Sequence, residues 1–404
     1  RCFNLCDSFP RLFDLVDESE TGELESVASA DFKAVIDACT LCDMCFMTKC
    51  PYVPPHEFDL DFPHLMVRCR AQELKQGKIG FAEKQLTETD RNGRLGCSMH
   101  GLANWASKQG NTLTRPLMQQ ILDVHEQAAL PPFTDKKLTA HSKPEVNTQA
   151  PAHGRKAVLY ATCTAEYNNP DIGLAALQVL ARNGVEAEVV YAGCCGMPQL
   201  EHGDLARVAD SAATVSAALK PWIDKGYDVI TPVASCGLML KFEWPLIVPE
   251  NKDVKLLSDC VFDISEYIID IAKKEGLADG LTALAGDVVV HIACHARAQN
   301  MGQKAAELLK HLPNTTVTVI ERCSGHGGAW GVMQDNFEVG LKVGKPVVRQ
   351  AAKVEPAHVV SECPLARDHI LQGMEQLDEA AEAIAATVSQ DRHPVQLLAR
   401  AYGF

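Results

Sequence analysis

The chain has 404 residues, enough for two or three domains with buried cores, and 47% of them are hydrophobic. Its formal net charge of −14 argues against non-specific nucleic-acid binding and against docking on anionic lipid by charge alone, because both need a basic surface. No apolar run reaches the roughly 18 residues that a membrane-spanning helix needs, and no export signal is visible, so a cytoplasmic protein is expected.

Sixteen cysteines are present, and two kinds of chemistry use so many. Disulfide frameworks belong mainly to short secreted chains that lack a hydrophobic core. This chain is long and apolar, so thiols that bind metal are favoured over disulfides.

The first part of the chain changes character along its length. Residues 1–60 are rich in cysteine and proline and are predicted to be loop-like, because proline blocks long helices. Residues 61–155 carry apolar residues at helical spacing as far as about position 121, and a polar, proline-rich stretch over 130–154. We predict a helical connector followed by a linker that wraps the surface.

From residue 156 onward, short β-rich runs alternate with helical segments. The runs AVLYATC, EAEVVYAG and YDVITPVAS predict buried strands, and the segments PDIGLAALQVLARNG and 205–225 predict helices. Strands that alternate with helices of this length predict parallel βαβ units. The expected fold is therefore α/β, with mainly parallel sheets.

The same order of strands and helices then occurs a second time. Equivalent cysteines, each at the end of a predicted strand, are separated by 131, 129 and 127 residues: Cys163 and Cys294, Cys194 and Cys323, Cys236 and Cys363. Such repetition predicts two copies of one domain, over 156–275 and 286–375. An alanine-rich helical tail over 376–404 follows them.

Four cysteines near the N-terminus have the form C-x2-C-x2-C-x4-C-P: Cys39, Cys42, Cys45 and Cys50. Two-residue spacings let a tightly turning loop direct successive sulfur atoms at one centre, and the bacterial ferredoxin motif differs only in its last spacing. The alternative is a zinc knuckle, but zinc sites usually combine two separated cysteine pairs. We therefore predict a 4Fe–4S site in a small ferredoxin-like module over residues 1–60.

Cys2 and Cys6 precede that motif with C-x3-C spacing, which is typical of the end of a first ferredoxin run. We therefore expect the natural protein to carry two further cysteines upstream of this sequence. By resemblance to two-cluster ferredoxins, one cluster is held by Cys6, Cys39, Cys42 and Cys45. The same resemblance makes Cys2 and Cys50 two of the four ligands of a second cluster.

The first copy offers four candidate ligands: Cys163, the adjacent pair Cys194 and Cys195, and Cys236. The carboxyl ends of parallel strands form one edge of a sheet, so three loops can bring four thiolates to one site. A glycine on either side of the pair suits close approach to a bulky cluster. Three other cysteines are interpreted as small buried hydrophobes without a function: Cys69, Cys97 and Cys260.

The sequence GCCG, with a cysteine about thirty residues before it and one about forty after it, resembles the cysteine-rich CCG domain. That domain occurs twice in the B-type and D-type subunits of heterodisulfide reductase. With the ferredoxin-like module in front, the chain resembles the heterodisulfide-reductase-related iron–sulfur proteins. These include the iron–sulfur subunits of anaerobic glycerol-3-phosphate dehydrogenase and of lactate or glycolate oxidases. The runs CTLCDMCFMTKCPY, NTLTRP and SCGLMLKFEWP share the resemblance.

The resemblance implies redox-active 4Fe–4S clusters: one or two in the N-terminal module, one in the first copy and one in the second. The second copy departs from the family pattern, because Ser324 stands where a second cysteine would follow Cys323. The family pattern ends in a C-x2-C pair, but neither Cys236 nor Cys363 has a second cysteine three positions later. The second copy therefore offers only three thiolates, which can hold a three-iron cluster, or a cubane if a further ligand is found. The candidates for that ligand are Ser324, His295 and His326. An iron without a thiolate would instead be a substrate site.

No glycine-rich dinucleotide motif follows a predicted strand, so a flavin or nicotinamide is expected on a partner chain. We therefore predict a subunit that carries electrons between a partner oxidoreductase, of the flavin dehydrogenase or peroxidase type, and another redox carrier. The alternatives are a catalytic thiol–disulfide reductase, by analogy with heterodisulfide reductase, and a redox sensor. Docking on a membrane partner would place the chain at the inner face of the membrane.

Overall fold

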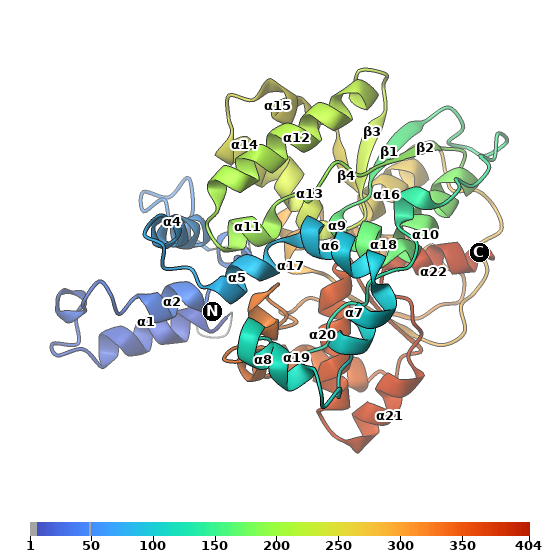
Figure 1. Cartoon of the computed structure of the whole chain (residues 1–404). Helices are drawn as coiled ribbons and strands as arrows, with labels where there is room; N and C mark the ends of the chain where they lie inside the picture. The colour runs from blue at the N-terminus through green and yellow to red at the C-terminus, as the bar shows by residue number, and fades with distance from the viewer. Residues whose placement is uncertain (1–5, 48–49) are drawn as a thin grey trace.

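The structure is a computed structural model of the chain and describes residues 6–47 and 50–404. It is mixed α/β, with two parallel sheets surrounded by helices, which confirms the predicted fold class (Figure 1). Within the described residues, no helix is both long enough and apolar enough to cross a bilayer.

The N-terminal part contains more helix than its prolines suggest, so the prediction of a loop-like segment is wrong there. Its elements are α1 Ser8–Asp17, the 3-10 helix η2 Leu24–Ser26, α2 Lys33–Asp37 and α3 Met44–Met47. Pro10 lies in the first turn of α1, where a backbone N–H has no partner within the helix, so proline is tolerated. The helix is anchored because the Ser8 hydroxyl donates to the Val35 carbonyl at 2.7 Å and the Phe9 ring stacks on Phe62 at 4.6 Å.

The connector forms helices where the apolar spacing predicts them. They are α4 Phe62–Lys75, α5 Phe81–Leu86, α6 Thr89–Ser98, α7 His100–Ser107 and α8 Arg115–Leu122. The Asp61 side chain caps α4 by accepting from the His64 N–H at 3.3 Å, and Pro63 occupies the first turn. In Figure 1, α6 lies beside α9 (Cys163–Tyr167) of the first copy, which it contacts.

The segment after α8 first contacts the second copy, where Val124 forms a bridge with Met333, and then runs over the first copy. Its one helical element is the short 3-10 helix η3 Leu138–Ala140. It is anchored by Leu138, which is 1% exposed and belongs to the core of the first copy. A Cβ at Gly173 would lie 2.2 Å from the Leu138 side chain, so a glycine there leaves room for the contact.

The first copy is built on a four-stranded parallel sheet with the order β2-β1-β3-β4. Its strands are β1 Lys156–Tyr160, β2 Glu186–Val190, β3 Asp228–Thr231 and β4 Val261–Asp263. Its helices are α9 Cys163–Tyr167, α10 Pro170–Arg182, α11 Met197–Glu201, α12 Leu205–Ile223, α13 Ala234–Leu238, the π-helical η4 Met239–Glu243, α14 Trp244–Ile247, α15 Lys252–Ser258 and α16 Ile264–Lys274. Leu159 of β1 pairs with Val189 on one side and with Ile230 on the other. The apolar residues of this central strand are fully buried, as parallel sheets covered on both faces require.

The second copy repeats this arrangement with three parallel strands in the order β6-β5-β7. The strands are β5 Val288–His291, β6 Val317–Ile320 and β7 His358–Ser361. The helices are α17 Cys294–Ala298, α18 Lys304–Leu309, the 3-10 helix η5 Trp330–Val332, α19 Phe337–Ala352 and α20 Pro364–Glu375. β5 corresponds to β1, β6 to β2 and β7 to β3, whereas among the described residues this sheet has no counterpart of β4.

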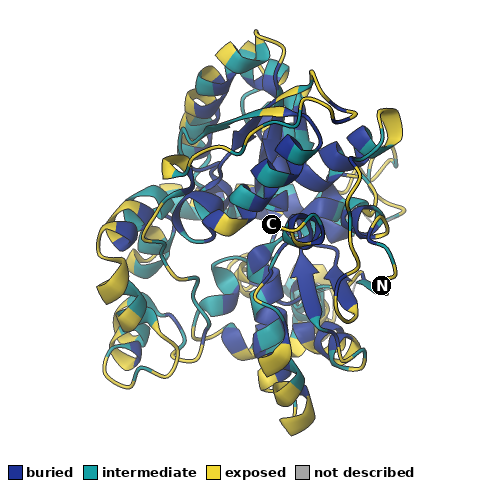
Figure 2. Ribbon diagram, turned by 90° about the vertical axis from the view of Figure 1, so that its right-hand side faces the viewer, coloured by how far each residue is buried: buried dark blue, intermediate teal, exposed yellow. Residues whose placement is uncertain are grey.

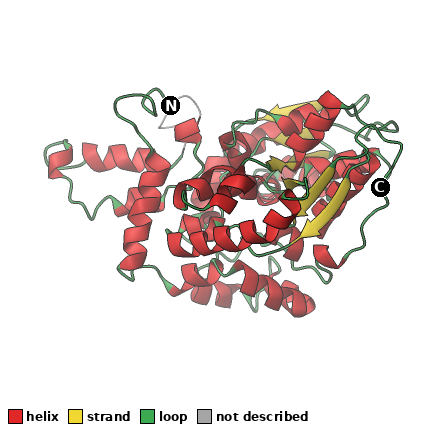
Figure 3. Ribbon diagram, turned by 90° about the horizontal axis from the view of Figure 1, so that it is seen from above, coloured by secondary structure: helices red, strands yellow, loops and turns green. Residues whose placement is uncertain are grey.

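The two copies share one apolar core. A single cluster of buried side chains joins Leu159 and Leu180 of the first copy to Val288 and Val290 of the second. The C-terminal helices are α21 Glu379–Thr387 and α22 Pro394–Ala401. Although α22 follows the second copy in sequence, it packs on α10 of the first (Figure 1). Buried residues gather along the strands in Figure 2, and Figure 3 shows the helices arranged around both sheets.

Candidate metal centres

The predicted ligands of both copies stand where strands end, at equivalent places. In the first copy, Cys163 begins α9 after β1, the adjacent pair follows β2, and Cys236 lies in α13 after β3. In the second copy, Cys294 begins α17 after β5, Cys323 follows β6, and Cys363 caps α20 after β7. The repeat inferred from cysteine spacing is therefore also a repeat of structure.

In the first copy, the four thiols lie close together. The sulfur atoms of Cys163 and Cys194 are 3.8 Å apart, and the Gly196 N–H donates to the Cys194 sulfur at 3.5 Å. Cys194, Cys195 and Cys236 are between 2% and 4% exposed. The Trp244 indole donates to the Cys195 carbonyl at 3.0 Å and fixes the loop from behind.

The electrostatics of this set fit a cluster with a cationic iron–sulfur core. Hydrogen bonds with Cys163 and Cys195 hold the pKa of Cys194 well below its ordinary value. The hydrogen bond with Cys194, together with burial, raises the pKa of Cys163, and hydrogen bonds with Cys194 and Cys236 and burial raise that of Cys195. One thiolate therefore forms readily, whereas further ionisation is opposed by burial and by like charge. Bound iron would compensate the remaining charges, as metal ions do for coordinating thiols.

Asp90 is a residue of this site that the sequence did not reveal. One oxygen of its carboxylate accepts from the Cys194 backbone N–H at 3.1 Å, and the other accepts from the hydroxyl groups of Tyr191 and, at 3.3 Å, Tyr167. Asp90 thus connects connector helix α6 to the loop that carries the cysteine pair. It lies 104 positions before Cys194, so no local pattern could have linked the two.

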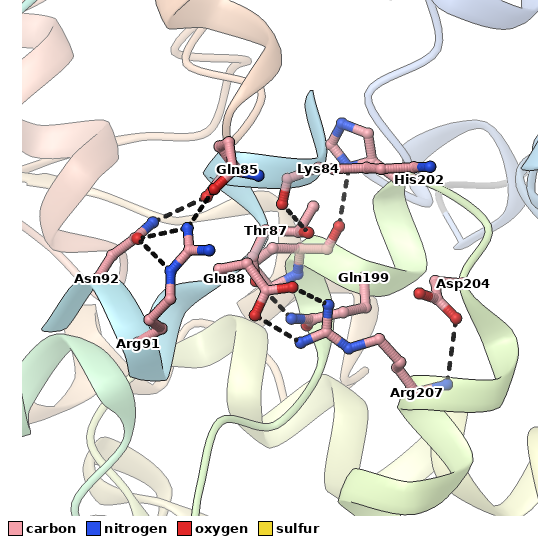
Figure 4. Close-up of polar contacts among 11 residues, drawn as sticks. Lys84, Gln85, Thr87, Glu88, Arg91, Asn92, Gln199, His202, Asp204 and Arg207 are labelled. Atoms are coloured by element: carbon pink, nitrogen blue, oxygen red, sulfur yellow. Dashed lines mark hydrogen bonds and ion pairs between the residues drawn. The ribbon is translucent and has the colours of Figure 1, made fainter. Parts of the chain in front are cut away.

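Polar contacts clamp the connector onto the first copy just beside Asp90 (Figure 4). The Arg207 guanidinium of α12 binds both oxygens of Glu88, at 2.6 and 3.1 Å. The Gln199 side-chain amide of α11 donates to the Thr87 carbonyl. These contacts hold the N-terminal end of α6 against the segment that follows the cysteine pair.

In the second copy, Cys294, Cys323 and Cys363 are neighbours. Burial, then the nearby thiols of Cys323 and Cys363, raise the pKa of Cys294. Burial also raises the pKa of Cys323, and it raises that of Cys363 to about 11. The Gly325 N–H donates to the Cys323 sulfur at 3.4 Å, the counterpart of the Gly196 contact in the first copy.

The three candidate additional ligands differ in what their side chains already contact. His295 uses both ring nitrogens, one with the Ser235 hydroxyl at 2.8 Å and one with the Leu41 carbonyl at 3.1 Å, so ligation would break one of these bonds. His326 has a buried Nε2 without a protein partner, and burial lowers its pKa to about 3, which keeps the ring neutral. Ser324 is 8% exposed, and both Ser324 and His326 border the same cavity as Cys323.

At the N-terminus, Cys6, Cys39 and Cys45 form one group. Burial raises the pKa of Cys39 to about 11, and burial and the thiols of Cys39 and Cys6 raise that of Cys45. Arg70 fixes this loop by donating to the Ile36 carbonyl at 2.7 Å and to the Cys39 carbonyl at 2.5 Å. Cys50 is partly buried, and Cys2 lies outside the described residues.

Cys42, in the same loop, is close to thiols of this group and of the second copy. Burial raises its pKa most, and the next contributions come from Cys294 and Cys323 of the second copy, ahead of Cys39. The residues on either side of it, Leu41 and Asp43, have φ of 47° and 57°, a left-handed conformation that is rare for such side chains.

A single cavity of about 1550 Å³ connects these sites. Its walls include all the candidate cysteines of both copies and one of the N-terminal module, namely Cys163, Cys194, Cys195, Cys236, Cys294, Cys323, Cys363 and Cys42. Over residues 6–47 and 50–404, no three His, Cys, Asp or Glu side chains are arranged to hold one metal ion.

The three cysteines without a predicted function lie apart from these groups. Cys97 is 8% exposed, and its thiol donates to the Tyr167 carbonyl at 3.4 Å. Cys260 directly precedes β4, and its carbonyl accepts from the Val229 N–H at 3.0 Å. Cys69 lies in α4 and is partly buried.

Comparison with known proteins finds a domain match in each copy and several relatives. Residues 157–241 and 288–365 match the CCG cysteine-rich domain. The chain is 24% identical over 319 residues to a subunit of the anaerobic glycerol-3-phosphate dehydrogenase of Escherichia coli (strain K12), covering 78% of this chain and 76% of that protein. It is 29% identical over 229 residues to a subunit of the fumarate reductase (CoM/CoB) of Methanothermobacter marburgensis, covering 55% of this chain and 43% of that protein.

A third relative, lactate utilization protein A of Bacillus pumilus, is 27% identical over 186 residues, which are 44% of this chain and 75% of that protein. These matches confirm the resemblance stated from the cysteine motifs. Two segments of the chain therefore match the cysteine-rich CCG domain, and its relatives include subunits of a dehydrogenase and of a reductase.

Proposed function

We propose that this protein is an iron–sulfur electron-transfer subunit of an oxidoreductase complex. The observation that carries the proposal is the shared cavity, whose walls bring together thiols of both CCG copies and of the N-terminal loop. Relatives named as subunits of a dehydrogenase and of a reductase support a role within a larger redox complex.

Three sets of residues would hold the clusters. The first copy contributes Cys163, Cys194, Cys195 and Cys236, the second contributes Cys294, Cys323 and Cys363, and the N-terminal loop contributes Cys6, Cys39, Cys42 and Cys45. Clusters bound there supply one-electron transfer at potentials tuned by hydrogen bonds to sulfur and by burial. The chain's own part is to hold the thiols, exclude water and donate the Gly196 and Gly325 N–H groups to sulfur.

The partner would be a flavin dehydrogenase or a peroxidase-type oxidoreductase, because this chain carries no dinucleotide motif of its own. We place the complex in the cytoplasm, docked where needed on a membrane partner. Purification of the native complex through an affinity tag on this chain, followed by identification of the co-purifying flavoprotein, tests this assignment.

Metal analysis tests the proposal directly. Three sets of thiols predict that anaerobically purified protein is brown and contains more iron than one four-iron cluster supplies, with matching acid-labile sulfide. Recovery of stoichiometric zinc in place of iron would refute the electron-transfer role.

A second function, reduction of a disulfide substrate, is favoured by one feature of the first copy. All four of its cysteines border a cavity large enough for a small molecule. Converting a disulfide into two thiols takes two electrons and two protons, and the clusters would supply the electrons one at a time. Thiol release from a mixed disulfide by the dithionite-reduced protein, after removal of excess reductant, tests this function; no release beyond that of buffer would reject it.

A further inference from the structure

Asp90 contacts the backbone of the loop that carries the thiol pair of the first copy. Its Oδ2 accepts from the Cys194 N–H at 3.1 Å, and a Cβ added at Gly193 would lie 3.7 Å from the same oxygen. Asp90 does not border the cavity that the cysteines line, so it is not a candidate ligand. A carboxylate is therefore held directly against the peptide unit of a predicted ligand without facing the ligand site itself.

The charge of Asp90 is not cancelled by a cation. The hydroxyl groups of Tyr191 and, at 3.3 Å, Tyr167 donate to its Oδ1, and such hydrogen bonds favour the ionised form of a carboxylate. The guanidinium of Arg207 is already paired with Glu88 at 2.6 Å. Within the described part of the chain, no Lys, Arg or His forms a salt bridge with Asp90. One negative charge therefore remains beside the first-copy thiols.

Asp90 also decides where one backbone donor of the loop points. The Gly196 N–H donates to the Cys194 sulfur at 3.5 Å, whereas the N–H of Cys194 itself donates to Asp90 and not to a sulfur atom. Hydrogen bonds to sulfur and the net charge around an iron–sulfur cluster are two of the factors that set its reduction potential. Asp90 adds a negative charge and withholds a donor from sulfur, and each effect opposes the arrival of an electron.

The second copy has no equivalent of this contact. Helix α6, which carries Asp90, packs on α9 of the first copy. Among the described residues, no carboxylate accepts from the Cys323 N–H, although the Gly325 N–H donates to the Cys323 sulfur at 3.4 Å. A cation lies near Cys323 instead, because burial raises the pKa of this thiol while the charge of Arg297 acts to lower it. The equivalent cysteines of the two copies thus have side chains of opposite charge nearby.

We propose that Asp90 is a positioning residue that lowers the reduction potential of the first-copy cluster and leaves that of the second copy unaffected. The inference rests on the proposed electron-transfer function. In the step that Asp90 opposes, one electron arrives from the partner oxidoreductase, no bond breaks and no proton is transferred.

An anaerobic redox titration of the full chain at a single pH, followed by EPR, tests this role. The first-copy signal is the one that Cys195→Ser alters. Asp90→Asn keeps the shape and an acceptor oxygen but removes the charge. At a fixed applied potential, the ratio of reduced to oxidised first-copy cluster should therefore rise several-fold in this variant. Asp90→Glu keeps the charge and should restore most of the parent ratio.

Tyr191→Phe should change the ratio in the opposite direction. It removes a donor that partly compensates the Asp90 carboxylate, so the ratio of reduced to oxidised first-copy cluster should fall. This variant leaves the carboxylate in place, and it reports the sign of the effect even if Asp90→Asn loses iron. Asp135→Asn, at an exposed carboxylate of the linker, is the control and should change nothing. The second-copy signal should be the same in all these variants.

Iron analysis of the same samples separates this role from the function on which it rests. If Cys195→Ser alters no iron–sulfur signal, the first copy holds no cluster and the proposed function fails at that site. If the signal is present but Asp90→Asn leaves the ratio unchanged, or Asp90→Glu raises it equally, the charge of Asp90 does not set the potential. A rise in Tyr191→Phe would also overturn the proposal, because loosening of the loop would then explain both variants.

Discussion

One side chain distinguishes the ligand sets of the two copies: Cys195 in the first stands where Ser324 stands in the second. Both positions are buried, and both follow a cysteine whose sulfur accepts from a glycine N–H. The difference therefore lies in the donor atom rather than in the surrounding loop. Hydroxyl oxygen binds iron less tightly than thiolate does, so the second copy should lose iron first.

Exchange of the donors should exchange this behaviour. Cys195→Ser should give the first copy faster iron loss in air, and Ser324→Cys should retain more iron in the second copy. The measurement is iron and labile sulfide after timed air exposure, with Cys97→Ser as a control at a thiol outside the sites. Faster decay of the first copy in the unmodified protein would show that donor number does not govern stability.

His64 gives a pH dependence at the contact between α4 and the first copy. Its ring bonds Asp61 at 2.6 Å and Glu243 at 3.1 Å, and these two hydrogen bonds raise the pKa of His64 to about 10. Between the unfolded value of about 6.5 and about 10, the folded state holds a proton that the unfolded state releases. This contribution to stability is thus complete below about pH 6.5 and is lost as the pH rises through about 10.

We therefore expect His64→Gln to lower the urea midpoint most near pH 6.5 and least near pH 10. The comparison is between variant and parent protein at each pH, with His311→Gln as control. A difference that is the same across this pH range would show that His64 acts without its charge.

At the scale of elements, α19 is shaped to receive the loop that carries the second-copy ligands. A Cβ at Gly344 would stand 2.3 Å from the Ser324 carbonyl oxygen, and one at Gly340 would stand 2.8 Å from that of Gly325. Both obstacles are backbone atoms, which cannot rotate away. The two glycines, one helical turn apart, let the loop lie directly on the helix.

Gly344→Ala should therefore destabilise the protein by about 1–3 kcal/mol, as overpacking does, and loosen iron in the second copy. The matched control is Gly101→Ala in α7, where a Cβ meets nothing within 4 Å. That change should stabilise by about 0.5–1 kcal/mol through helix propensity alone. Urea unfolding measures the stability of the two variants, and metal analysis measures the iron that each retains. Equal effects of the two substitutions would contradict the close approach of the ligand loop to α19.

At the scale of the whole molecule, α22 ties the end of the chain to the first copy. Val395, Leu397 and Leu398 are fully buried in the core that both copies share. The Thr282 N–H also donates to the Ala401 carbonyl at 2.9 Å, so the helix closes over the segment between the copies. The two copies should therefore unfold together.

Leu398→Ala should cost about 2–5 kcal/mol, the usual range for a leucine removed from a core. Phe404→Ala, at a side chain that is 54% exposed, should change stability by no more than about 0.5 kcal/mol. Anaerobic urea unfolding, followed by circular dichroism and by cluster absorbance, measures both. Separate transitions for the two copies in the parent protein would contradict a shared core.

The sequence by itself determined the repeat, the parallel α/β class and the placement of ligands at strand ends. These features depend on local patterns, such as the apolar run of β1 or the spacing of Cys163, Cys194 and Cys236, and on the rule that parallel strands end at one edge. It misjudged α1, because Pro10 occupies the helical turn where proline does no harm.

Only the tertiary structure decided which groups meet. The contact of Asp90 with Cys194, the bonds of His295 to Leu41 and Ser235, and the packing of α22 on α10 join residues 60 to 254 positions apart, or elements as distant. Such contacts follow from how whole elements pack, since no short-range pattern records the distance between chemically ordinary residues. The spacing of the N-terminal cysteines shows that they can converge, but only the packing of the loop, with Thr40 against Gly327, places Cys42 on the cavity that the cysteines of both copies line.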